Sequence, residues 1–211
     1  MKLIQYLNDD FFTQQQLLAA SAIDLAELED LQKRGIMPQA SYTLKLDVSC
    51  NSFFGPHHEQ MDVAYYAKEY VSWIDEMRSQ SGDDALKIFA QRYKTRLQQL
   101  NDAGITTQHE KLNAGLDAHL ISEWKYFLDG VYGLCTKSGL PEDIAAKELA
   151  VVIIKEITEE RLDKDLSTAE LARLKIAVDL LDSASTPFAP HEVLRSSRHR
   201  LIDQVRSAYH L

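Results

Sequence analysis

TQQQLLAASAIDLAELEDLQKRGIMP, residues 13–38, predicts two short helices joined by a tight turn. Thr13 is a good N-cap for the first helix because its hydroxyl can accept a free backbone N–H. Asp24 can cap the second helix in the same way. Gly35 can adopt the left-handed conformation that ends this helix, and Pro38 prevents the helix from continuing. This spacing is typical of a helix-turn-helix.

The next segment, SYTLKLDVS at residues 41–49, alternates between apolar and polar side chains. Its apolar positions share one face and are Tyr42, Leu44, Leu46 and Val48. Alternation with period two predicts a strand. A single strand is not stable alone, so we expect a partner strand near Phe11–Phe12 or Ser52–Phe54. A helix-turn-helix followed by a strand pair is the outline of a winged helix, and Gly55–Pro56 would close it.

After residue 55 the sequence predicts only helices. They are expected over residues 63–77, 86–100 and 120–135, from Pro141 onward, after the capping box Ser167–Glu170, and from about residue 190 to residue 209. LAVVII, residues 149–154, can be a strand in isolation, but its flanking helix formers favour a deeply buried helix. The predicted fold class is mainly α. A winged-helix-like module with a short β element spans residues 1–55, and an all-helical bundle spans residues 56–211.

Composition indicates a soluble globular protein. The chain has 211 residues, of which 45% are hydrophobic and 26% are charged. The two cysteines, Cys50 and Cys135, are far apart, which is typical of free buried thiols in a reducing compartment. No apolar run approaches the roughly 20 residues that span a bilayer, and the N-terminus lacks the features of a signal peptide. We therefore expect a cytoplasmic protein without a membrane partner.

The charge distribution opposes long-range attraction to nucleic acid. The net charge is −9 and the pI is about 5.2. Residues 1–60 contain four Lys or Arg against eight Asp or Glu. Residues 191–211 contain four Lys or Arg against two Asp or Glu, and they form the one segment with a net positive charge.

Residues 12–38 resemble the N-terminal module of MerR-like bacterial regulators. The matching positions are Phe12 for the aromatic residue, Leu17–Leu18 for the Leu-Ala pair, Ala22–Ile23 for the turn, Leu28 and Leu31 for the inward face of the second helix, and Gly35–Ile36 with Pro38 for its end. The layout of a small winged module and a helical body also resembles the AphA-type regulators. This resemblance implies a regulator-like protein that binds DNA as a homodimer, with a helical body for dimerisation or ligand sensing. The expected DNA contacts are Gln14, Gln15, Gln16, Lys33, Arg34 and Lys45.

The second helix departs from the family in its charge. Glu29 stands where the family has an arginine after the buried leucine, and Glu27 and Asp30 flank it. Affinity for DNA comes mainly from cations that neutralise phosphates, and the first turn of the reading helix contacts base edges. A protein-interaction or accessory module that has lost DNA binding is therefore an equal alternative.

The C-terminal stretch HEVLRSSRHRLIDQVRSAYH, residues 191–210, predicts an amphipathic helix with one cationic face. That face contains His191, Arg195, Arg198, His199, Arg206 and His210. It can contact phosphates, an acidic partner or a second subunit. Docking on the acidic body of the same chain, or simple solvation, is the favoured interpretation.

The remaining polar clusters are weak candidates for chemistry. His57, His58, Glu59 and Asp62 offer metal ligands at the foot of a predicted helix, but a solvated cluster is favoured over a metal site. His119 and Glu123 are four residues apart, and a hydrogen bond at the helix surface accounts for them. Cys135 lies in an apolar stripe and is expected in the core. Six aromatic residues can line a ligand pocket between helices, but a packed core is the favoured interpretation: Tyr65, Tyr66, Tyr70, Trp73, Trp124 and Tyr132. No catalytic or cofactor motif is present, so an enzyme ranks last and no cofactor is expected.

Overall fold

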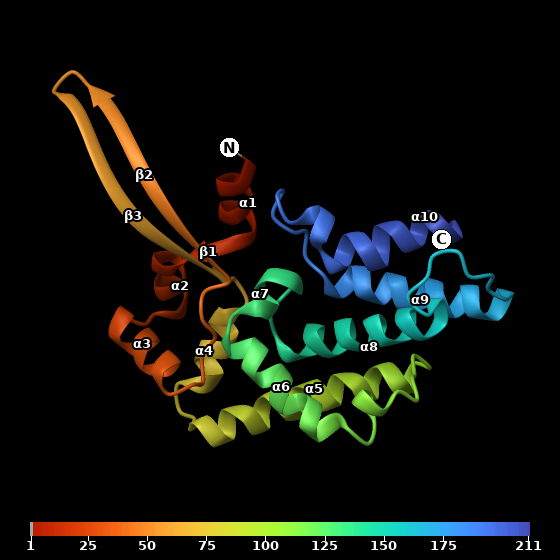
Figure 1. Cartoon of the computed structure of the whole chain (residues 1–211). Coiled ribbons are helices and arrows are strands. Elements are labelled where there is room, and N and C mark those ends of the chain that lie inside the picture. Colours follow the sequence, from red (N-terminus) through yellow and green to blue (C-terminus); the bar gives the residue numbers. More distant parts are fainter. Residues whose placement is uncertain (1) are drawn as a thin grey trace.

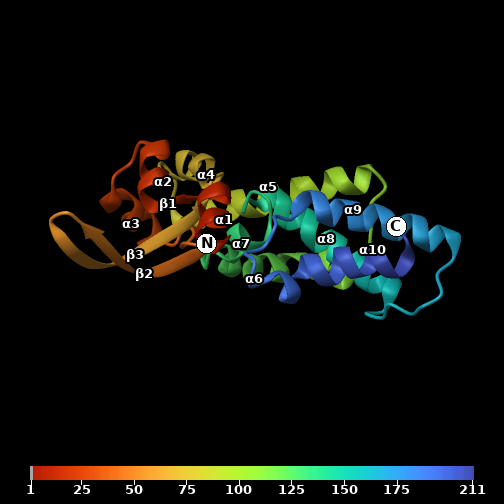
Figure 2. The ribbon, with the colours of Figure 1, turned by 90° about the horizontal axis from the view of Figure 1, so that it is seen from above.

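The computed structural model describes residues 2–211, apart from the side chains of Gly82 and Asp83. The chain is mainly helical and carries a small antiparallel sheet from which a long hairpin extends (Figure 1). Viewed from above, the hairpin and the first helices lie at one end of an elongated molecule, and the helical body forms the other end (Figure 2). Among the described residues, no helix is long and apolar enough to cross a membrane.

The N-terminal part starts with the elements α1 (Lys2–Asp10), β1 (Phe11–Thr13), α2 (Gln14–Ser21) and α3 (Leu25–Lys33). The Thr13 hydroxyl accepts from the Gln16 backbone N–H, and the Gln16 side chain accepts from the Thr13 N–H at 2.8 Å. Asp24 accepts from the backbone N–H of Glu27 at 2.8 Å. Ala22 takes the left-handed conformation between the two helices. The two predicted helices, their caps and their tight turn are therefore confirmed.

The sheet contains β2 (Tyr42–Ser52) and β3 (Gly55–Ala67), and its strand order is β1-β3-β2 with antiparallel pairing throughout. The strand predicted at residues 41–49 is confirmed. Its partner is β3. The expected partner strand at Ser52–Phe54 is wrong, because Ser52 is the last residue of β2 itself. The end of the module, predicted at residue 55, falls at the turn of this hairpin.

The prediction of a helix over residues 63–77 is wrong in its first half, because β3 continues to Ala67. Val63 and Ala67 have helical spacing, but together with Tyr65 they also fit period two. Pairing with β2 satisfies the backbone of this segment in the extended form. Helix α4 begins only at Tyr70 and ends at Met77.

The rest of the body is helical. It comprises α5 (Gly82–Asp102), the 3-10 turn η1 (Glu110–Leu112), α6 (Leu116–Leu128), α7 (Val131–Cys135), α8 (Pro141–Thr158) and α9 (Thr168–Ala184). The helices expected at residues 86–100, after Pro141 and after the capping box are confirmed. The single helix expected over residues 120–135 is wrong, because Gly130 at a φ of 75° separates α6 from α7.

Helix α8 is the central element of the body and packs against both α5 and α9 (Figure 1). Ile144, Leu149 and Ile154 are among its fully buried side chains. The interpretation of residues 149–154 as a buried helix is confirmed. Pro141 at the first turn, with Glu142 and Asp143 behind it, suits the positive end of the helix dipole.

One hydrophobic core joins the N-terminal part to the body. It runs from Leu17 and Leu28 through Trp73 to Ile154 without interruption. Trp73 packs against the Phe127 ring, with 4.9 Å between centroids, and its Nε1 donates to the Ile36 carbonyl at 2.8 Å. The six aromatic residues that were expected in the core, Trp73 among them, are all buried.

The continuous helix expected over about residues 190–209 is wrong. The segment forms a 3-10 turn η2 (Val193–Arg195), a π-helical turn η3 (His199–Asp203) and α10 (Gln204–Tyr209). Ser196 interrupts it because its hydroxyl donates to the Val193 carbonyl at 2.7 Å and accepts from the His199 N–H at 3.0 Å. The expectation of two buried thiols is correct for Cys135 and wrong for Cys50, which is exposed on the hairpin.

Candidate functional site

The hairpin of β2 and β3 is the most prominent surface feature (Figure 1). At its base one face packs on α1, where Leu44 and Val63 contact the small core of Leu7, Phe11 and Tyr65. Beyond this base, side chains on both faces are exposed. The base therefore anchors the hairpin to the protein, and the outer half of the hairpin does not pack against the core.

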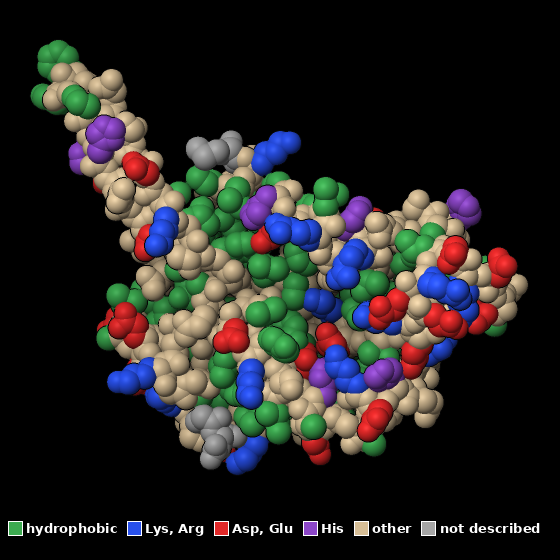
Figure 3. Space-filling model, in the orientation of Figure 1, with side chains coloured by type: hydrophobic (Ala, Val, Ile, Leu, Met, Phe, Trp, Pro, Cys, Tyr) green, Lys and Arg blue, Asp and Glu red, His purple; other side chains and the backbone are tan. Residues whose placement is uncertain are grey.

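The tip of the hairpin is aromatic. Phe53 and Phe54 form the two-residue turn, their side chains are 97% and 94% exposed, and their rings meet edge-on at 5.4 Å. Gly55 follows at a φ of 112°, a conformation that favours glycine. Apolar side chains cover the tip in Figure 3. Single exposed apolar residues are common, but a pair of aromatic rings at the end of a protruding arm is typical of a binding anchor.

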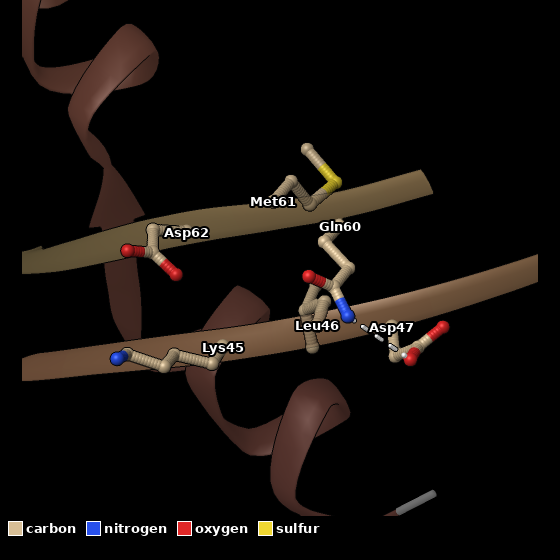
Figure 4. A pocket seen from close by; sticks show the side chains of 6 residues that line it. All are labelled: Lys45, Leu46, Asp47, Gln60, Met61 and Asp62. Carbon is tan, nitrogen blue, oxygen red and sulfur yellow. Dashed lines mark hydrogen bonds between the residues drawn. The ribbon is translucent and has the colours of Figure 1, made fainter. Parts of the chain in front are cut away.

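One face of the hairpin is polar and acidic, whereas Leu46 and Met61 pair on the other face (Figure 4). Lys45 pairs in register with Asp62, and Asp47 pairs with Gln60, whose Nε2 donates to Asp47 Oδ2 at 3.4 Å. Lys45 is the one Lys or Arg within residues 42–67, where three acidic residues accompany it. Lys45, a predicted DNA contact, is exposed. The acidic residues of the two strands outnumber it.

Helix α3 presents an acidic surface. Glu29 and Asp30 are exposed, and Glu27 accepts from Arg78 Nε at 2.8 Å. Arg34, a predicted DNA contact, pairs with Asp30 at 3.1 Å and donates to the Gln80 carbonyl. Lys33 is exposed and has no ion pair among the residues that the structure describes. Of the two cations at the end of α3, one is already held by the protein.

The three glutamines that were predicted to contact DNA have different roles. Gln16 closes the capping box of α2 and is therefore engaged. Gln14 and Gln15 line a shallow depression together with Leu46 and Met61 of the hairpin. The structure brings these two glutamines next to the hairpin, whereas Arg34 lies beside the end of α4.

The predicted cationic face at the C-terminus is divided by the break in its helix. Arg198 pairs with Asp182 of α9 at 2.5 Å, and Arg206 pairs with Asp179 at 2.9 Å and with Asp182 at 2.7 Å. Arg195 is exposed. The hydrogen bond from Arg206 lowers the pKa of the Asp179 carboxyl below its usual range. Two arginines of this face are thus bound to the acidic body of the same chain.

We predict that Arg206→Gln lowers the free energy of unfolding at pH 7 by about 0.5–1 kcal/mol, as expected for a partly exposed ion-pair network. Because the pKa of Asp179 is lowered in the folded state, this stabilisation is present above the usual aspartate pKa and is lost as the pH falls through the lower, folded-state value. Urea unfolding at neutral and acidic pH measures both effects. Arg195→Gln is the matched control, and equal losses for the two variants at pH 7 would contradict the assignment.

A second group of polar side chains is buried in the body, between α5, α6, α7 and α8. His119 and Glu123 belong to it, with side chains that are only 7% and 5% exposed, so the prediction of a surface pair is wrong. Burial and the nearby Glu148 carboxylate raise the pKa of Glu123 to about 7. Burial and the charge of Lys111 lower the pKa of His119 to about 4. At neutral pH His119 is therefore mainly neutral, whereas the Glu123 carboxyl is close to half ionised.

Sequence reasoning missed most of this group because its members come from distant segments. Tyr93, Lys111, Tyr132, Lys147 and Glu148 surround the pair from four elements. The available signal was Lys147–Glu148, two adjacent charges within the otherwise apolar residues 144–154 of helix α8. Lys147 is buried, and its Nζ donates to Cys135 Sγ at 2.7 Å. Burial raises the pKa of the Cys135 thiol, which lies in the core as predicted.

Comparison with known proteins gives a family match for the helical body of the chain. No curated protein and no solved structure matches it. A family model, described as a family of unknown function (DUF6058), matches residues 85–210. This match begins in α5, contains the whole buried polar group, and leaves out the hairpin and α1 to α4. Since it covers more than half of the residues, the chain belongs to the DUF6058 family.

Proposed function

We propose that this chain is a regulator-like protein whose N-terminal part is a winged-helix-like module that binds a basic protein surface. The element order α1-β1-α2-α3-β2-β3 and the strand order β1-β3-β2 support a winged helix. In that arrangement α3 occupies the position of the recognition helix and the β2–β3 hairpin is the wing. The fold alone does not specify the partner, which depends on the charges and apolar groups of the surface.

The charge of both contact elements favours protein over DNA, and this is the observation that carries the proposal. Exposed Glu29 and Asp30 lie on α3, and Lys45 is the one cation of the wing. A DNA-binding surface needs several free cations for phosphates. A basic protein surface complements these acids, and an apolar pocket on that partner can take the aromatic tip at Phe53 and Phe54.

DNA is the second candidate. The helix-turn-helix geometry favours it, together with the exposed Lys33 and Lys45 and the position of Gln14 and Gln15 beside the wing. A homodimer would present two such modules, and its half-sites would lie one helical turn of DNA apart or a multiple of it. The two candidates differ in their salt dependence, and this difference separates them.

Fluorescence anisotropy with random genomic duplexes at low and physiological salt tests the choice. We expect no saturable binding even at low salt, where electrostatic attraction is strongest. Lys33→Ala combined with Lys45→Ala serves as the matched variant, because both side chains are exposed and their removal leaves the core intact. Binding that weakens steeply with salt and is lost in this double variant would establish the DNA candidate instead.

Site-specific photo-crosslinking in cells tests the protein partner directly. A photoreactive residue at position 54 of the wing is expected to crosslink to a protein through an apolar segment that lies next to lysine and arginine residues. The same residue in place of Ile176, which is 51% exposed on α9, is the positional control. Glu29→Lys should abolish the crosslink by reversing the charge of α3. Crosslinks that persist in Glu29→Lys, or that are equal at both positions, would contradict the proposal.

A further inference from the structure

Three potential metal ligands converge in the body of the molecule. His119, Glu123 and Glu148 each offer one ligand atom, and these atoms lie within 4.8 Å of one another. His119 and Glu123 are one turn apart on α6, which places them on the same face of the helix. Glu148 approaches from α8. The packing of α6 and α8 thus brings one imidazole and two carboxylates to a common point.

Each of the three side chains contacts a polar group of another residue. Tyr93 Oη lies 3.4 Å from His119 Nε2, Tyr132 Oη donates to Glu123 Oε2, and Lys111 Nζ donates to Glu148 Oε2 at 2.6 Å. Metal ligands in proteins are usually oriented in this way, with one atom hydrogen-bonded and another left for the ion. The anchoring partners come from three further segments, which fixes the orientation of all three side chains.

One pair of the remaining atoms has the spacing of two ligands to one ion. His119 Nδ1 lies 3.4 Å from Glu123 Oε1, and among the described residues no hydrogen bond joins these two atoms. Two ligands that bind a tetrahedral ion at about 2.0–2.1 Å are about 3.4 Å apart. Glu148 Oε1 also receives no hydrogen bond from the described part of the chain. Each side chain therefore retains one atom for a ligand.

We propose that His119, Glu123 and Glu148 bind a divalent first-row transition metal ion, with Zn²⁺ as the reference ion. One imidazole nitrogen and two carboxylate oxygens suit Zn²⁺, and they leave a fourth position for water. One buried carboxylate, Glu123, and one partly buried carboxylate, Glu148, supply the negative charge that a divalent ion requires. Every residue of this site, including its three anchoring partners, lies within the DUF6058 match. The site is independent of the function proposed for the N-terminal module.

Calorimetric titration of the full-length, chelator-treated protein with Zn²⁺ tests the site. A background variant with His57→Ala and His58→Ala removes the exposed histidines of the hairpin, which can bind zinc adventitiously. In this background we expect one equivalent of Zn²⁺ and a rise in the thermal midpoint on loading. Bound Co²⁺ should give the visible absorption of a tetrahedral site, whereas Mg²⁺, which prefers all-oxygen octahedral sites, should not bind.

Two ligand variants keep the test decisive. Glu148→Gln has nearly the same shape as the native side chain and should fold, and we expect it to weaken Zn²⁺ binding at least tenfold. His119→Ala should remove binding at the site, with circular dichroism as the check on its fold. His109→Ala, a histidine of the same body outside the cluster, should bind zinc like the background. Absence of stoichiometric binding, or binding that both ligand variants retain, would mean that the cluster is only a hydrogen-bonded network.

Discussion

Gly130→Ala should lower the free energy of unfolding by about 3 kcal/mol or more. Gly130 adopts a φ of 75° between α6 and α7, a conformation that is unfavourable for alanine. An added Cβ would lie 2.5 Å from the Gln39 carbonyl oxygen and 2.9 Å from that of Ala40. Both neighbours are backbone atoms, so relief requires movement of a whole segment.

That segment connects α3 to β2, and it is hydrogen-bonded to the same turn. The Gln39 N–H donates to the Leu128 carbonyl at 2.8 Å, and Ser41 Oγ donates to the Gly130 carbonyl at 2.9 Å. Gly130→Ala therefore strains the junction between the N-terminal part and the body. Gly104→Ala is the matched control, since Gly104 has a φ of 83° but nothing lies within 4 Å of an added Cβ. It should cost only about 1–2 kcal/mol in urea unfolding, and equal losses would refute the steric argument.

Trp73→Ala should cost about 3–5 kcal/mol, because it empties the centre of the shared core. Trp73 is fully buried and packs against Phe127 and Trp124, with ring centroids 4.9 Å and 6.1 Å away. Its loss also leaves the buried Ile36 carbonyl without its donor. The effect combines a cavity with an unsatisfied polar group.

Denaturant unfolding measures this loss. It should be followed by circular dichroism and not by tryptophan fluorescence, because the substitution removes one of the two tryptophans. Trp73→Phe keeps most of the ring packing but removes the donor, so it should cost clearly less than Trp73→Ala. Both variants should unfold in one transition, because the core is continuous between the two parts. Two separate transitions in Trp73→Ala, with only one of them shifted, would contradict a shared core.

Local signals in the sequence were sufficient for much of the fold. The caps at Thr13, Asp24 and Ser167 predict their helices correctly, because a side-chain oxygen that satisfies a free N–H acts within three residues. Alternation over residues 41–49 predicts β2 correctly, because successive side chains of an extended chain point to opposite faces. These features depend on neighbours in sequence and need no tertiary context.

Features that depend on distant partners were not predictable in this way. The pattern of Val63 and Ala67 fits a helix and a strand equally, and pairing with β2 selects the strand. His119 and Glu123 look like a surface pair until α5 and α8 cover them. The contribution of Glu148 to the candidate metal site is visible only in the packed structure.

The exposed thiol of Cys50 allows the hairpin to be labelled selectively. Cys135 is buried, so a maleimide reagent should modify Cys50 selectively and place a fluorophore close to the aromatic tip. Such a label reports on the hairpin without any engineered cysteine. The same thiol can join two molecules by a disulfide when purified protein is exposed to air. Measurements of oligomeric state therefore require a reductant or Cys50→Ser, so that a covalent artefact is not counted as non-covalent association.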